Sequence, residues 1–137
     1  MSAPGSDQTD EIRQAVRRFA KEQLAPNAAK WDRDHTFPRE ALSGLAAMGL
    51  YAVAVREELG GAGMDYTSLA VACEEISAGD CATATIVSVN NLVGGILAGY
   101  GNDFQKQNFL KPLAQGKRIG ASALTEPHLG SSAAGST

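Results

Sequence analysis

The segment CATATIVSVNNLVGGILAGYG (81–101) constrains the fold most, because it is apolar or small on nearly every side. A helix without a polar face must be covered by other helices or by lipid. Its Thr, Ser, Asn and Gly residues argue against a membrane span. Its β-branched residues weakly favour a strand, but its length and the stop at Gly101 favour a helix. We therefore expect a central helix surrounded by others.

Apolar residues at helical spacing predict four further helices, over 12–24, 38–48, 66–76 and 103–115. We expect Pro26 to break or kink the chain after the first, and Pro38 to occupy the first turn of the second. Asp65 is expected to cap the third helix. Asn102 and Gln105 match the capping box that starts a helix. In the last helix, Phe104, Leu110 and Leu113 are expected to face inward.

Three stretches between or after these helices differ in pattern. The apolar run LYAVAV (50–55) could be extended. GGAG (60–63) invites comparison with a phosphate-binding loop, but no Lys-Ser/Thr follows and no strand precedes it at the required spacing, so a tight turn is the better interpretation. After Gly116 the residues are small and extended in pattern. The sequence thus predicts a helical domain over 1–116 and the start of a β-type domain over 117–137.

Charge and cysteine content exclude several functions. The net charge is −3 and no basic block occurs, so nucleic acid is not an expected partner. No secretory signal or membrane anchor is apparent, and we expect a cytoplasmic protein. Cys73 and Cys81 are expected to be small buried residues in a reducing compartment. Two cysteines without a supporting His/Asp cluster cannot form a closed zinc site, so no metal is expected.

Several motifs in a fixed order resemble the N-terminal portion of the flavin-dependent acyl-CoA dehydrogenases. The most specific are GLYAVAVREELGGAGMD (49–65), the GND…QK…PLA.G block (101–116) and LTEP..GS (124–131). The resemblance runs from about residue 10 to the end. It implies an all-α domain, an up-down or orthogonal bundle, followed by a middle β-barrel-like domain and a C-terminal four-helix bundle. The chain would then end at the first strand of a truncated β-domain.

The resemblance also implies a flavin site near the C-terminus of the chain. Ser122, Leu124 and Thr125 would line the ring of FAD through backbone and hydroxyl contacts. Gly130 and Ser131 would contact its phosphate region, where glycine permits close backbone approach and successive N–H groups can hold an anion. The family usually has small residues at 128 and 129 and an acid at 132. His128 and Ser132 therefore leave the details of this loop open.

Substrate contacts follow from the same resemblance. Ser131 would lie near the pantetheine arm of an acyl-CoA, and Ser88, Val89 and Leu92 match positions that border the acyl tail. Core packing of these three residues is an equally good interpretation. The catalytic carboxylate of the family lies in the C-terminal part, so we expect no catalytic residue in this chain and no activity from it alone.

The expected function is therefore the N-terminal part of an enzyme that dehydrogenates acyl-CoA to enoyl-CoA with hydride transfer to FAD. Two alternatives remain open. One is a non-catalytic helical assembly module. The other is a relative with a different CoA-thioester reaction, such as desulfination. Helices that normally cover a β-domain would expose apolar surface, which predicts a homo-oligomer or association with a chain that carries the missing domains.

Overall fold

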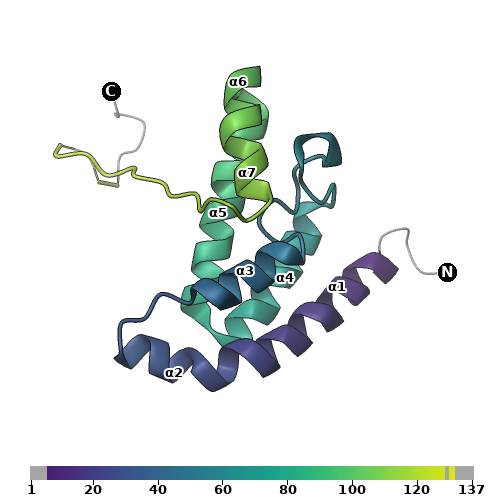
Figure 1. Ribbon diagram of the computed structural model, residues 1–137, viewed down its shortest axis with the longest axis vertical. Helices are drawn as coiled ribbons and strands as arrows, with labels where there is room; N and C mark the ends of the chain where they lie inside the picture. Colours follow the sequence, from purple (N-terminus) through teal and green to yellow (C-terminus); the bar gives the residue numbers. More distant parts are fainter. Residues whose placement is uncertain (1–5, 129, 132–137) are drawn as a thin grey trace.

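The computed structural model describes residues 6–128, 130 and 131. Helices account for most of this part, and Figure 1 shows their arrangement. In chain order they are α1 (Ser6–Phe19), η1 (Ala20–Leu24), α2 (Ala25–Arg33), α3 (Arg39–Ala47), η2 (Glu57–Leu59), α4 (Tyr66–Gly79), α5 (Cys81–Tyr100), α6 (Asp103–Gln105), η3 (Lys106–Leu110) and α7 (Lys111–Ala114). No strand occurs in the described residues. The predicted helical fold is therefore confirmed.

The central helix predicted from the apolar segment is α5. It packs against α4, and its buried residues lie on one side: Thr83, Ala84, Val87, Asn90, Asn91 and Gly94. On another side, Leu92 and Ile96 are about half exposed and Tyr100 is almost fully exposed. The expectation of complete coverage is thus wrong for this face. By length and composition, α5 could also cross a membrane, a criterion that buried core helices meet equally.

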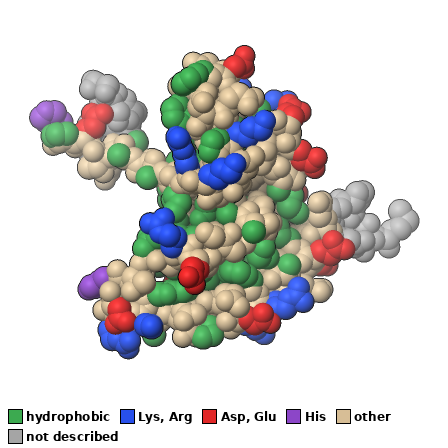
Figure 2. All heavy atoms as spheres, viewed as in Figure 1, with side chains coloured by type: hydrophobic (Ala, Val, Ile, Leu, Met, Phe, Trp, Pro, Cys, Tyr) green, Lys and Arg blue, Asp and Glu red, His purple; other side chains and the backbone are tan. Residues whose placement is uncertain are grey.

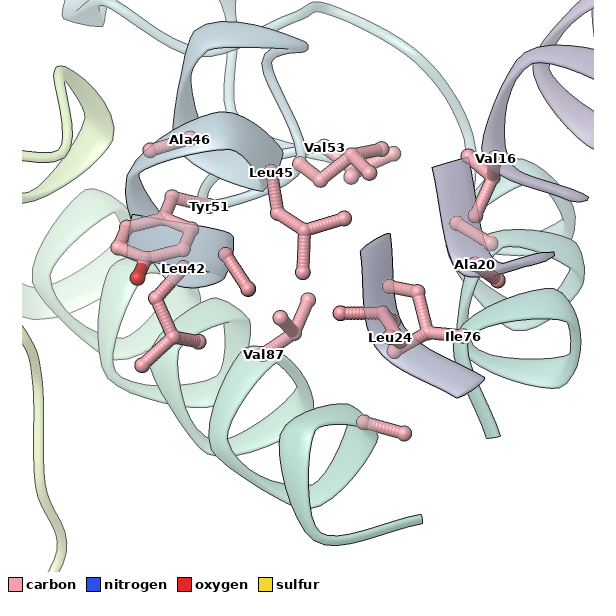
Figure 3. Close-up of a cluster of buried hydrophobic side chains, with 14 residues drawn as sticks. Val16, Ala20, Leu24, Leu42, Leu45, Ala46, Tyr51, Val53, Ile76 and Val87 are labelled. Carbon is pink, nitrogen blue, oxygen red and sulfur yellow. The ribbon is translucent and has the colours of Figure 1, made fainter. Parts of the chain in front are cut away.

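The main core lies where α5 meets the other helices. Leu24, Leu42, Leu45, Ile76 and Val87 are almost inaccessible to water and come from η1, α3, α4 and α5 (Figure 3). Full burial of each such side chain contributes about 1.5–3 kcal/mol relative to exposure. The pattern of apolar residues that predicted these helices therefore also identifies the residues that hold them together.

Two π-helical turns allow proline inside long helices. The π-turn η1 joins α1 to α2 without interruption, and Pro26 follows it directly in the first turn of α2. The π-turn η3 likewise precedes α7, which has Pro112 in its first turn. Proline cannot donate a backbone hydrogen bond, and a π-turn changes the bonding pattern locally. The helix is therefore continuous at Pro26 and not broken there, but its direction changes between α1 and α2 (Figure 1).

Residues 50–55 form a buried turn, so the extended conformation considered for this run is wrong. Tyr51, Ala52 and Val53 are 1% exposed or less. Their backbone groups are held by side chains of α5 and by the following glycine-rich turn. There, the N–H of Ala62 donates to the carbonyl of Ala52 at 3.0 Å, and that of Gly63 to Val55 at 2.8 Å. These bonds confirm GGAG as a tight turn.

The predicted helix caps are confirmed, but two burial predictions are wrong. Asp65 accepts a hydrogen bond from the N–H of Ser68, and Asn102 forms both bonds of its capping box. Phe104 is 67% exposed and packs edge-on against another ring rather than into the core. Cys81 is exposed, while Cys73 is partly buried, which raises the pKa of its thiol and favours the neutral form.

In the segment 117–128, Gly120 still contacts α5, and the residues beyond it run away from the helices (Figure 1). Within the described part of the chain this segment forms no ladder of hydrogen bonds, so the strand expected there is not formed. A β-strand needs a neighbouring strand to satisfy its backbone groups, and the described residues offer none. The proposed domain boundary at 116 stays a prediction.

A buried carboxylate ties α1 to α4. Glu75 is 5% exposed and accepts hydrogen bonds from Arg17 Nη2 at 2.6 Å, Arg17 Nε at 2.8 Å and Arg13 Nη1 at 3.1 Å. The bonds from Arg17, followed by those from Arg13, hold the pKa of Glu75 below its usual value despite burial. The pair of helices is therefore linked by a charge that must remain ionised.

This ion pair predicts a loss of stability in acid. Because the pKa of Glu75 is lower in the folded state, its contribution is present above the usual value of 4.5 and is lost as the pH falls through the folded pKa. We expect Glu75→Gln to reduce stability at neutral pH and to flatten its decline below pH 4.5. Urea unfolding at several pH values measures this. Glu74→Gln is the control, since Glu74 is 68% exposed and, among the described residues, pairs with Arg13 alone. An unchanged pH dependence in Glu75→Gln would contradict the assignment.

Candidate functional site

An open groove lies between the start of α4 and the exposed face of α5. Its volume is about 410 Å³, and Tyr66 and Leu69 of α4 form one wall. The remaining lining residues are contributed by α5: Ser88, Asn91, Leu92, Gly95, Ile96 and Tyr100. None of these side chains carries a charge at neutral pH. The groove therefore suits an uncharged, partly aliphatic group better than a carboxylate or a cation.

The structure brings together two of the three predicted substrate residues. Ser88 and Leu92 lie four residues apart on α5, so they share one face of the helix, and both line the groove. Val89 is partly buried and does not line it. The sequence analysis missed Tyr66, Ile96 and Tyr100. Continuing the spacing of Ser88 and Leu92 along α5 would have found Ile96, whereas Tyr66 requires knowledge of how α4 packs.

The predicted flavin residues lie on the extended segment that follows α7. Ser122, Leu124 and Thr125 are exposed, and 61% of the surface of Leu124 is accessible to water. Within the described residues, the backbone of 121–124 forms no hydrogen bond. Backbone N–H and C=O groups without a partner among the described residues, hydroxyl side chains and one apolar contact are what the edge and face of a planar cofactor require. The segment therefore fits FAD chemically.

The distal part of this loop is only partly described. Gly130 and Ser131 are exposed, while Leu129 and Ser132 lie outside the described residues. Among described residues other than glycine, only His35 has a positive φ. His128 therefore has an ordinary backbone conformation, and replacing a small residue at this position does not strain the loop. Its imidazole is exposed.

Figure 2 shows hydrophobic side chains gathered across the middle of one face, beneath the point where the C-terminal segment leaves the helices. A second and larger pocket, of about 640 Å³, lies elsewhere, between α2, the turn that follows it and the start of α5. It contains Trp31 and Phe37 but none of the predicted site residues. The groove on α5 is therefore the better candidate site.

Comparison with known proteins identifies the family. Residues 6–117 match the model of the acyl-CoA dehydrogenase N-terminal domain. The chain belongs to the acyl-CoA dehydrogenase family. It is 44% identical over 123 residues to the short-chain specific acyl-CoA dehydrogenase of Rattus norvegicus, covering 89% of this chain and 30% of the relative. It is 46% identical over 121 residues to the Homo sapiens protein, and the match covers 88% of this chain and 29% of the relative.

Solved acyl-CoA dehydrogenase structures confirm the fold. The butyryl-CoA dehydrogenase of Megasphaera elsdenii superposes with a TM-score of 0.88 at 28% identity, covering 100% of this chain and 37% of that one. A glutaryl-CoA dehydrogenase of Mycobacterium smegmatis in complex with FADH2 superposes with a TM-score of 0.87 at 33% identity. The match covers 94% of this chain and 33% of that one. The chain thus spans about a third of the length of the family members that it matches.

Proposed function

We propose that this chain is the N-terminal part of a flavin-dependent acyl-CoA dehydrogenase, in which it supplies one wall of the acyl-chain groove and one wall of the flavin site. The observation that supports the proposal most directly is that one helix carries both features. The side of α5 with Ser88 and Leu92 lines an uncharged groove, and Asn90 of the same helix bonds the segment that leads to Ser122.

The reaction removes the α-proton and the β-hydride of an acyl-CoA thioester, and FAD, when bound, supplies the hydride acceptor. In this proposal Ser122, Leu124 and Thr125 orient the ring system, and the groove on α5 holds the hydrocarbon tail. The uncharged lining of the groove favours an aliphatic acyl chain. Gly130 and Ser131 would contact the phosphates, with Ser131 also near the pantetheine arm.

A single open groove and one exposed segment cannot enclose a ligand, since functional pockets bury about 70–90% of a ligand's surface. The isolated chain is therefore expected to retain neither FAD nor activity. In the proposed enzyme the remaining walls come from further domains, on the same chain or on an associated one, and the assembly is a homo-oligomer. Desulfination or another CoA-thioester reaction would use the same flavin contacts.

A chimera tests this function. In it, the aligned part of the present chain replaces the matching stretch, 123 residues in the alignment, of the Rattus norvegicus short-chain specific acyl-CoA dehydrogenase. We expect the purified chimera to show visible flavin absorbance and to oxidise a short acyl-CoA with an artificial electron acceptor. A folded chimera without flavin would contradict the proposal and favour the alternative of a helical assembly module, for which the exposed Tyr66 and Tyr100 are the supporting observation.

The groove is tested separately in the same chimera. Leu92→Trp should fill the groove and lower kcat/KM by about tenfold or more, a cost of about 1.4 kcal/mol in transition-state stabilisation, while flavin content stays unchanged. Ser77→Trp is the matched control, because Ser77 is exposed on α4 and lines no described pocket. Equal activity in the two variants would show that the acyl chain does not enter the groove.

A further inference from the structure

Asn90 is a buried polar residue that joins three separate parts of the chain. Its side chain is on α5 and has no exposure to water. Its Nδ2 donates to the carbonyl of Tyr51 at 3.3 Å, and its Oδ1 accepts from the N–H of Gly120 at 2.6 Å. Buried amides are placed where their hydrogen bonds are satisfied, so each bond fixes the partner backbone with respect to α5.

Gly120 allows the backbone to approach α5 closely enough for this bond. A Cβ atom at this position would lie 2.9 Å from Val93 Cβ and 2.9 Å from Leu113 Cδ1. Contacts this short are not tolerated, so any larger residue would push the backbone away from Asn90. The side-chain amide of Asn90 and the lack of a side chain at Gly120 are therefore both needed for this anchor point.

This bond is the last that the described segment makes with the helices. Residues 121–124 form no hydrogen bond within the described part of the chain, and they are exposed. The point at which the segment with Ser122 and Thr125 leaves the helical domain is therefore set at Gly120. Ser122, two residues downstream of this anchor, can lie no farther than about 7 Å from it, because each residue spans about 3.3–3.6 Å.

The anchor and the groove lie on opposite sides of the same helix. Ser88 faces the groove, and Asn90 is two residues further along, which corresponds to a rotation of about 200°. Because α5 is rigid between them, the bond to Gly120 sets the position of the exposed segment relative to the groove. The acyl groove and the flavin segment, which must meet around one substrate, would then both be positioned by α5.

We propose that Asn90 is a positioning residue that holds the segment 120–125 in register with the acyl groove. The proposal rests on the proposed function for its purpose, since that function assigns the segment to FAD. Asn90 itself need not contact either ligand. Asn91, the neighbouring amide, holds only residues 50–53 and α5 and has no contact with Gly120.

Amide hydrogen exchange followed by NMR on the present chain tests the anchor without flavin. In Asn90→Leu, the Gly120 amide should exchange at least about tenfold faster relative to the core amide of Ile76, as expected when one buried hydrogen bond is lost. Leucine fills nearly the same space as asparagine, so faster exchange at Gly120 with Ile76 still protected would come from the lost hydrogen bond and not from lost packing. Asn108→Leu, at an exposed site, should leave the Gly120 amide unchanged.

A second variant covers the case in which Asn90→Leu does not fold. Gly120→Ala leaves Asn90 intact and should speed exchange at residue 120 and shift the amide signals of Ser122 and Thr125, with Ile76 still protected. Unchanged exchange at 120 in the folded variants would overturn the proposal. Loss of Ile76 protection in both Asn90→Leu and Gly120→Ala would overturn it too, because the bond would then hold the helices themselves. None of these outcomes depends on flavin binding, which the chimera measures separately.

Discussion

Replacing Asn91 with leucine is expected to destabilise the fold by about 3 kcal/mol or more. Asn91 is 8% exposed. Its Oδ1 accepts from the N–H of Val53 at 2.8 Å, and its Nδ2 donates to the carbonyls of Leu50 at 2.7 Å and Val87 at 2.9 Å. Each buried backbone group left without a partner costs about 1–3 kcal/mol. Leucine has a similar size but satisfies neither Val53 nor Leu50.

Urea unfolding monitored by circular dichroism measures this loss. The matched control is Asn108→Leu, because Asn108 is exposed and its amide bonds a single carbonyl one helical turn away. That substitution should change stability by no more than about 0.5 kcal/mol. A cost of less than about 1 kcal/mol for Asn91→Leu would mean that water bonds the backbone groups of Val53 and Leu50 in the variant. The turn over residues 50–55 would then be less buried than described.

Truncating Leu45 to alanine is the second large effect. Leu45 has no exposure to water and lies between Tyr51, Val53 and Val87 (Figure 3). Removing its branched end deletes buried apolar contacts and leaves a cavity that rigid neighbours cannot fill. Such substitutions cost about 2–5 kcal/mol, which is a large part of the 5–15 kcal/mol by which domains are typically stable.

The exposed Leu92 provides the control for Leu45. The two substitutions remove the same atoms, but Leu92 is 53% exposed, so Leu92→Ala should cost less than about 1 kcal/mol in the same unfolding experiment. Similar costs for the two variants would mean that another chain or a second copy covers the groove face of α5 in solution. Sedimentation of the sample at the same concentration would reveal such association.

The sequence predicted the helices well because their signals are local. The capping residues Asp65 and Asn102 bond backbone groups three residues away, and the length of 81–101 alone favoured a helix. The extended conformation considered for residues 50–55 was wrong for a reason no local pattern contains. Asn91, some 40 residues later in the chain, supplies the hydrogen bonds that a strand partner would otherwise have provided.

In the candidate site too, residues with a local signal were predicted and residues that depend on tertiary packing were missed. Ser88 and Leu92 could be chosen because family resemblance and helical spacing agree. Tyr66 joins them only because α4 packs beside α5, and the sequence contains no sign of that contact. Phe104 was predicted to face inward with Leu110 and Leu113 from the spacing of apolar residues, yet it is exposed on α6. From the sequence, Asn90 is one polar residue in an apolar helix. Its role depends on Tyr51 and Gly120, which are distant in the sequence.

The π-turns before Pro26 and Pro112 have a consequence for how this domain can change over evolution. A π-turn corresponds to one residue inserted into an α-helix, and each residue rotates the helix by about 100°. The wider turn takes up this extra residue, so removing a single residue from η1 would restore regular winding and leave Trp31 facing the core that it now contacts. Each of these two helices can therefore lose this one residue without turning its buried side chains away from the core.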